Sequence, residues 1–162
     1  MKIGVVSDTH IASPAHELPQ HMLARFRAEE VKLILHAGDV GHQCVLDRLS
    51  QIAAVKAVAG NMDPPELKAK LPKKLVVAAG GVRFGLAHGS GPADRLGERL
   101  LPMFDGDDID VLVYGHSHKS RNEDFKGVLL FNPGSACTGR TPSYGILTVE
   151  DGRVYGEIVR IG

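Results

Sequence analysis

The sequence of 162 residues predicts an α/β fold. Residues 2–7 and 31–37 are apolar nearly throughout and do not alternate with polar residues, which is typical of strands buried on both faces. Between them, apolar side chains recur at helical spacing over residues 18–30. Several strands end in a glycine or in polar groups. We therefore expect strands covered by helices or by another sheet, with polar groups at the strands' carboxyl ends.

In the first half of the chain, helices and strands alternate. The apolar faces of the two predicted helices consist of Leu18, Met22, Leu23 and Phe26, and of Val45, Leu46, Leu49 and Ile52. A short strand is expected at residues 55–59. Pro64, Pro65 and Pro72 then bracket a segment that we interpret as irregular, because proline is not tolerated inside a long helix or a central strand.

The second half contains most of the expected strands. The Gly80-Gly81 turn joins strands at residues 75–79 and 82–87 into a hairpin. A third helix follows, marked by Leu96, Leu100, Leu101 and Phe104. The stretch from Val111 to Tyr114 is a further buried strand, and residues 128–131, 144–149 and 154–158 are expected to form a meander or hairpin.

Composition limits the partners and the location of the protein. The 19 basic and 19 acidic residues balance, without a Lys/Arg cluster, so long nucleic acids and anionic membranes are not expected partners. No apolar run has membrane-spanning length and no leader pattern is seen at the N-terminus. Cys44 and Cys137 lie far apart and form no Cys-x-x-Cys pair, which fits reduced thiols better than a disulfide scaffold. We expect a cytoplasmic location; a homo-oligomer is left open.

Ligand-type side chains follow five of the expected strands: Asp8, His10, Asp39, Asn61, His88, His116 and His118. Each alone has a structural explanation, such as a helix cap, a turn or a buried histidine. Functional groups at the carboxyl ends of parallel strands can converge, however, and buried carboxylates and imidazoles are costly to bring together without a cation. Jointly, these residues predict a metal site.

Five sequence blocks resemble those of the calcineurin-like metallophosphoesterases, and specifically their small bacterial and archaeal phosphodiesterase branch. The blocks are Asp8-Thr9-His10, Gly38-Asp39, Gly60-Asn61-Met62-Asp63, His88-Gly89 and Gly115-His116-Ser117-His118. The resemblance covers essentially the whole chain and implies a single metallophosphoesterase domain over residues 1–162. It also implies a four-layer αββα sandwich of two mixed β-sheets flanked by helices.

The resemblance further implies two metal ions. Asp8, His10 and His118 would bind one, Asn61, His88 and His116 would bind the other, and Asp39 would bridge them. Two cations brought together by a carboxylate generate a nucleophilic water or hydroxide and neutralise charge on phosphate. The resemblance implies that the activity is hydrolysis of small phosphodiesters. Imidazoles mixed with carboxylates favour transition metals, with Mn expected and Fe, Ni, Co or Zn as alternatives. Asp39, Asn61 and His88 are the expected catalytic residues.

Several residues near these blocks need separate interpretation. In many superfamily members a histidine that can protonate the leaving group follows the asparagine ligand; here Met62 occupies the position, and a thioether donates no proton. Asp63, another histidine or a water molecule would then have to supply this proton. His36 is interpreted as a core histidine. Asn61 and Arg140 are candidate substrate contacts, and the segment 132–135 resembles a loop that supports the site.

Two alternatives remain. The same fold serves as a catalytically inactive scaffold in the retromer subunit, although all seven ligand positions here retain competent residue types. A nuclease or a phosphoprotein phosphatase of the same superfamily is less favoured, because a short, neutral chain offers little surface for gripping a polymer or a protein.

Overall fold

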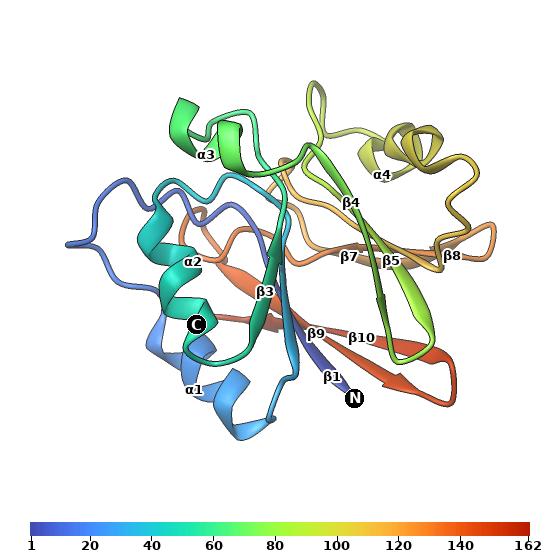
Figure 1. The fold of residues 1–162 in the computed structure, drawn as a ribbon, viewed down its shortest axis with the longest axis horizontal. Coiled ribbons are helices and arrows are strands. Elements are labelled where there is room, and N and C mark those ends of the chain that lie inside the picture. Colours follow the sequence, from blue (N-terminus) through green and yellow to red (C-terminus); the bar gives the residue numbers. More distant parts are fainter.

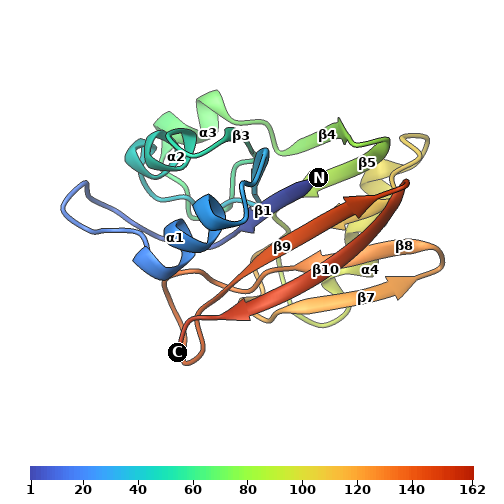
Figure 2. The same ribbon diagram turned by 90° about the horizontal axis from the view of Figure 1, so that it is seen from below.

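The first of two five-stranded sheets contains both ends of the chain. The computed structural model describes residues 1–162, and this sheet has the order β10-β9-β1-β2-β3. Its strands are β1 (Lys2–Val6), β2 (Leu33–His36), β3 (Ala54–Ala57), β9 (Ser143–Glu150) and β10 (Arg153–Arg160). The strands β1, β2 and β3 are parallel, whereas β9 is antiparallel to β1 and forms a hairpin with β10 (Figure 2).

The second sheet has the order β4-β5-β6-β8-β7. Its strands are β4 (Lys74–Ala79), β5 (Val82–Ala87), β6 (Val111–Val113), β7 (Arg121–Phe125) and β8 (Val128–Asn132). Here β5, β6 and β8 are parallel, and the antiparallel strands β4 and β7 form the edges. Both sheets are therefore mixed, as expected.

The helices cover the outer faces of the two sheets. They are α1 (Gln20–Ala28), α2 (Gln43–Ser50), α3 (Pro65–Lys70), α4 (Leu96–Leu100) and the 3-10 helix η1 (Leu101–Phe104). In Figure 1, α1 and α2 lie on one side of the strands and α4 on the other. Apolar residues of α1 and α2 pack on the first sheet and those of α4 and η1 on the second. The predicted four-layer αββα sandwich is confirmed.

The central core lies between the sheets. Ile3, Val5 and Leu35 of the first sheet pack against Phe84 and Phe131 of the second, and all five are fully buried. Residues 2–6 and 33–36 lack alternation because their other face is buried too, under α1 and α2. No helix in the structure has the length and apolar character needed to cross a membrane.

Two expectations about individual elements were wrong, and one strand was not predicted. The segment 64–72 contains the six-residue helix α3, because Pro65 occupies the first turn, where its missing N–H is no loss. The edge strand β7 was missed, since its Arg-Asn-Glu-Asp-Phe sequence has no apolar periodicity. Finally, residues 128–131 do not form a meander with the last two strands: β8 lies in the other sheet, and only β9 and β10 form a hairpin.

Candidate metal centre

The seven predicted ligand-type residues lie together at the carboxyl ends of five strands, which run parallel within each sheet. They follow β1, β2 and β3 of the first sheet and β5 and β6 of the second. Contacts of 3.0–3.9 Å link all seven: His10, His118, Asp8, His88, Asp39, Asn61 and His116. Residues separated by more than 100 positions, such as Asp8 and His118, therefore share one site.

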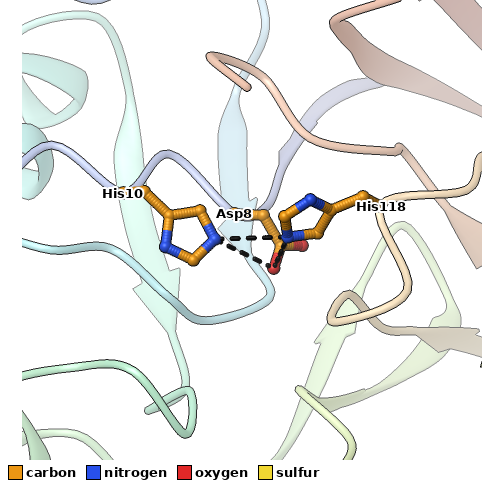
Figure 3. Close-up of side chains that lie close together, drawn as sticks. All are labelled: Asp8, His10 and His118. Carbon is orange, nitrogen blue, oxygen red and sulfur yellow. Dashed lines mark hydrogen bonds and ion pairs between the residues drawn. The ribbon is translucent and has the colours of Figure 1, made fainter. Parts of the chain in front are cut away.

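Asp8, His10 and His118 form one side of the cluster, and Figure 3 shows the Asp8 carboxylate between the two rings. The Oδ1 atom of Asp8 lies 3.2 Å from Nε2 of His118 and 3.7 Å from Nε2 of His10. The two Nε2 atoms are 3.2 Å apart. Three ligand atoms thus face one small volume, an arrangement that can hold a metal ion.

The other side of the cluster contains Asp39, Asn61, His88 and His116. Nε2 of His88 lies 3.2 Å from Oδ2 of Asp39 and 3.0 Å from Oδ1 of Asn61, which is also 3.1 Å from Nδ1 of His116. Oδ2 of Asp39 lies 3.7 Å from Nε2 of His10 as well, so this carboxylate faces both sides. Asp8 likewise belongs to two groups, one with His10 and His118 and one with Asp39 and His88.

Hydrogen bonds to backbone carbonyls orient two of the imidazoles. Nδ1 of His88 lies 2.7 Å from the Ala37 oxygen, and Nε2 of His116 lies 2.9 Å from the Gly91 oxygen. Because a carbonyl only accepts, each of these nitrogens carries the proton, and a neutral ring then presents its other nitrogen as a lone pair. The lone-pair nitrogens are those that face Asn61. Such tautomer selection is typical of metal-ligating histidines.

Backbone strain is concentrated at the same positions. Asp8, His10, Asp39, His116 and His118 all have positive φ angles, between 49° and 66°. Residues other than glycine rarely adopt this left-handed backbone conformation. It persists where the surrounding structure enforces it, often at functional sites. Five of the seven cluster residues are held in this way.

Glycines allow the strand ends to approach the carboxylates. A Cβ atom on Gly60 would lie 2.1 Å from Oδ1 of Asp39, and one on Gly115 would lie 1.9 Å from Oγ of Ser7 and 2.7 Å from Oδ2 of Asp8. Neither position has room for a side chain. The glycines that end the β3 and β6 segments are therefore required by close packing around the site.

The buried oxygen Oδ1 of Asp8 is an indicator of cation binding. The Asp8 side chain is fully buried, and its Oδ2 accepts hydrogen bonds from Oγ of Ser7 at 2.6 Å and from the His116 N–H at 3.1 Å. Oδ1 has no hydrogen-bond partner, although buried carboxylate oxygens are almost always satisfied. Surrounded by imidazole nitrogens, it fits a metal ligand, and the donor set fits a divalent transition metal.

The charges of the cluster also favour cation binding. Burial alone would raise the pKa of Asp8, but the neighbouring imidazoles, beginning with His10, outweigh it and hold this pKa below its usual value. For Asp39 the same burial effect is outweighed mainly by His88. Conversely, Asp8 raises the pKa of His10, and Asp39 raises that of His88 despite burial. The two carboxylates therefore attract positive charge, which protons or metal cations can supply.

The predicted supporting loop at residues 132–135 acts on the backbone of the site. The buried Asn132 amide donates to the Gly115 oxygen at 3.0 Å and to Oγ of Ser117 at 3.1 Å, which holds the turn that carries both histidines. Oγ of Ser135 donates to the Asp8 oxygen at 2.7 Å. The expectation of support is met, but not through imidazole nitrogens, whose partners are main-chain carbonyls elsewhere.

Three further residues discussed in the sequence analysis lie in different surroundings. His36 is fully buried and contacts the Gly38 N–H and the Thr9 hydroxyl, which confirms it as a core histidine. Arg140 is exposed, and no hydrogen bond or ion pair joins it to the cluster, so its contact with substrate stays a prediction. Met62 is 68% exposed beside the site.

Sequence reasoning missed two contributors to the site. Gly91 supplies a backbone carbonyl to His116, and no side chain signals that role. Arg99 of α4 donates to the carbonyls of Ser90 and Pro92, on either side of Gly91, and thereby fastens this loop. An arginine within a predicted helix does not by itself indicate such a function.

Comparison with known proteins identifies the family. The model of the calcineurin-like phosphoesterase superfamily domain matches residues 1–152. The chain belongs to this superfamily. This calcineurin-like phosphoesterase is 41% identical over 156 residues to a probable metallophosphoesterase of Methanocaldococcus jannaschii, covering 93% of this chain and 77% of the relative. It is 30% identical over 174 residues to a phosphodiesterase of the same organism, covering 98% and 99%.

A solved structure supports the fold independently. Wild-type Vps29 of Entamoeba histolytica, complexed with zinc, is 26% identical to this calcineurin-like phosphoesterase, with a TM-score of 0.77 and 99% of each chain covered. The family assignment and the cluster agree: the residues that suggested metal chemistry in the sequence lie together in a metallophosphoesterase fold.

Proposed function

We propose that the protein is a dinuclear metal-dependent phosphodiesterase that hydrolyses small phosphodiesters. The observation that carries the proposal is the buried, unpartnered Oδ1 of Asp8, around which imidazole nitrogens and a second carboxylate converge. The similarity to a phosphodiesterase over 98% of the chain supports the reaction class. Phosphodiester preference itself is our inference.

We assign the ligands by the two sides of the cluster. Asp8, His10 and His118 would hold one cation, Asn61, His88 and His116 the other, and Asp39 both. When bound, the cations supply Lewis acidity, which lowers the pKa of water and neutralises charge on the phosphate. The position of Asp39 Oδ2, within 3.7 Å of both His10 and His88, supports its bridging role.

Asp39, Asn61 and His88 are the proposed catalytic residues. Asp39 is fixed by the Met62 N–H, which donates to its Oδ1 at 2.8 Å and leaves Oδ2 directed at the cluster. His88 is 3% exposed, so its ring keeps a fixed position and excludes water behind it. Asn61 is exposed and borders a cavity, which suits contact with both a cation and the phosphate.

The chain offers no proton donor where other superfamily members place a histidine. Met62 carries no acidic proton, and Asp63 accepts from the Gly41 N–H at 2.9 Å and from the Gly60 N–H at 2.8 Å through its two oxygens. A carboxylate that accepts at both oxygens holds two loops together and does not serve as an acid. We propose that water protonates the departing oxygen, which favours substrates with good leaving groups.

The direct test compares wild type with Asp39→Asn. Purified protein loaded with Mn²⁺, the cation we propose, is incubated with bis(p-nitrophenyl) phosphate, and metal content is measured in parallel. We expect Asp39→Asn to lower the rate at least about a hundredfold, since even groups that only support ligands contribute ten- to a hundredfold. Asp105→Asn, at an exposed site after η1, should retain full activity. Equal rates for Asp39→Asn and wild type would refute the proposal.

The same preparation separates the alternatives. Protein that binds metal yet hydrolyses neither phosphodiesters nor phosphomonoesters would favour a scaffold. A panel containing monoesters, diesters, a phosphopeptide and single-stranded DNA, assayed with Mn, Fe, Ni, Co and Zn, distinguishes a small-molecule diesterase from a nuclease or phosphoprotein phosphatase. The two free cysteines support the cytoplasmic location that we propose.

A further inference from the structure

A cavity beside the cluster has no assigned role. It has a volume of about 430 Å³ and lies between α3 on one side and the end of α4 with η1 on the other. Asn61 and His88 are among its lining residues, so it borders the cluster. We call it the α3–α4 cavity. Its size falls within the range of small-molecule sites, roughly 300–1,000 Å³.

The wall formed by α4 and η1 is apolar. Leu100 and Met103 line it, and Met103 keeps 42% of its surface exposed although it is a large hydrophobic residue. Ala59 and Ala87 add to the apolar surface at the strand ends. A flexible thioether beside leucine is suited to packing on the face of a flat ring.

The opposite wall is positively charged. Lys68 of α3 and Lys73, just before β4, both line the cavity and both are exposed. Only Lys2 and Lys74 among the lysines form ion pairs, so neither cavity lysine is neutralised by a carboxylate. Nζ of Lys68 donates to the backbone oxygen of Asn61 at 2.7 Å, which holds the ammonium group close to the cluster.

A second cavity on the other side of the cluster differs in chemistry. It borders His10 and Met62, has a volume of about 550 Å³, and is lined by one carboxylate, Glu66, and one ammonium group, Lys70. These two charges offset each other, whereas the α3–α4 cavity is lined by Lys68 and Lys73 and by no carboxylate. An anionic substituent therefore fits the α3–α4 cavity better than the second cavity.

We infer that the α3–α4 cavity binds the organic arm of the phosphoester, and that this arm is a flat aromatic group carrying a further negative charge, as in a phosphorylated nucleoside. This inference rests on the proposed function only in placing the phosphoryl group at the cluster. The ring would lie against Leu100 and Met103, and its anionic substituent would face Lys68 and Lys73.

Equilibrium binding of non-hydrolysable phosphonates tests the inference without relying on catalysis. Mn²⁺-loaded protein is titrated calorimetrically with methylphosphonate, phenylphosphonate and 4-carboxyphenylphosphonate. We expect phenylphosphonate to bind about tenfold more tightly than methylphosphonate, as partial burial of a ring allows, and the carboxyl group to add a further gain. Met103→Ser should reduce the advantage of the phenyl group, and Lys73→Gln should reduce that of the carboxyl group, while both leave methylphosphonate binding unchanged.

Two remote substitutions serve as matched controls. Tyr155 is 55% exposed and pairs with Thr148, opposite Lys2, at the end of the first sheet that lies away from the cluster. Lys32 is exposed just before β2, at the same end. Tyr155→Ser and Lys32→Gln should leave all three affinities at the wild-type values.

The outcomes separate this inference from the proposed function. Equal affinities of wild type for methyl- and phenylphosphonate would overturn the cavity assignment while leaving the metal centre intact. Equal effects of Met103→Ser and Tyr155→Ser would overturn it as well. Failure of metal-loaded protein to bind methylphosphonate would overturn both, because the phosphoryl position itself would then be wrong.

Discussion

Lowering the pH from 7 to 5 should reduce the unfolding free energy of the metal-free protein by about 2 kcal/mol through His36 alone. His36 ends β2 and is fully buried. Its Nδ1 accepts from the Gly38 N–H at 3.2 Å. The Thr9 hydroxyl donates to the Val40 oxygen at 2.8 Å and so accepts from Nε2–H of His36 at 3.1 Å. Both ring nitrogens are satisfied only in the neutral tautomer.

The magnitude follows from the pKa of His36, which burial lowers from 6.5 to about 4. Below pH 6.5, His36 binds a proton in the unfolded chain but not in the folded protein, so the unfolding free energy falls as the pH decreases towards 4. With these two pKa values, the stability lost through His36 is about 0.2 kcal/mol at pH 7 and about 2 kcal/mol at pH 5. Above pH 7 the contribution disappears.

The assay is urea unfolding followed by circular dichroism at pH 7 and pH 5 in the presence of EDTA. His36→Asn is the informative variant, because an asparagine oxygen can still accept from the Gly38 N–H and only the contact with Thr9 is lost. It should be less stable than wild type at pH 7, yet lose about 2 kcal/mol less than wild type between the two pH values. His16→Asn, at an exposed position, should follow the wild-type pH dependence. An identical pH dependence for wild type and His36→Asn would refute the reasoning.

Three further predictions concern close packing, loop support and thiol reactivity. Gly60→Ala would place a methyl group 2.1 Å from Oδ1 of Asp39, so we expect at least about a tenfold loss of metal affinity by calorimetry; wild-type affinity would contradict this packing argument. Arg99→Ala should free the loop whose carbonyl orients His116 and weaken metal binding about tenfold, whereas Arg99→Lys should restore it in part; equal affinities for all three proteins would exclude a supporting role. Burial raises the pKa of the Cys137 thiol to about 11, so iodoacetamide at pH 8 should leave it largely unmodified by mass spectrometry, and rapid labelling of the folded protein would contradict this burial effect.

The sequence predicted the buried strands well because their signal is local. Residues 2–6 and 33–36 are apolar nearly throughout, and that composition is visible without any partner. The polar edge strand β7 had no such signal, because Arg121–Phe125 is specified by pairing with β8 and not by its own pattern. The short helix α3 was hidden by prolines that the first helical turn tolerates.

The candidate site was likewise predicted in part from the sequence and in part only from the structure. The identities of its ligand-type residues, and hence the expectation of metal chemistry, came from the sequence alone, because nearly all of them follow strands that an apolar run defines. The tautomers of His88 and His116, the unpartnered oxygen of Asp8 and the α3–α4 cavity came only from the tertiary structure. These features depend on backbone carbonyls, neighbouring side chains and cavity-lining residues that distant segments of the chain contribute. A residue's own chemistry is fixed by its type, but its orientation, protonation and neighbours are fixed by contacts that only folding creates.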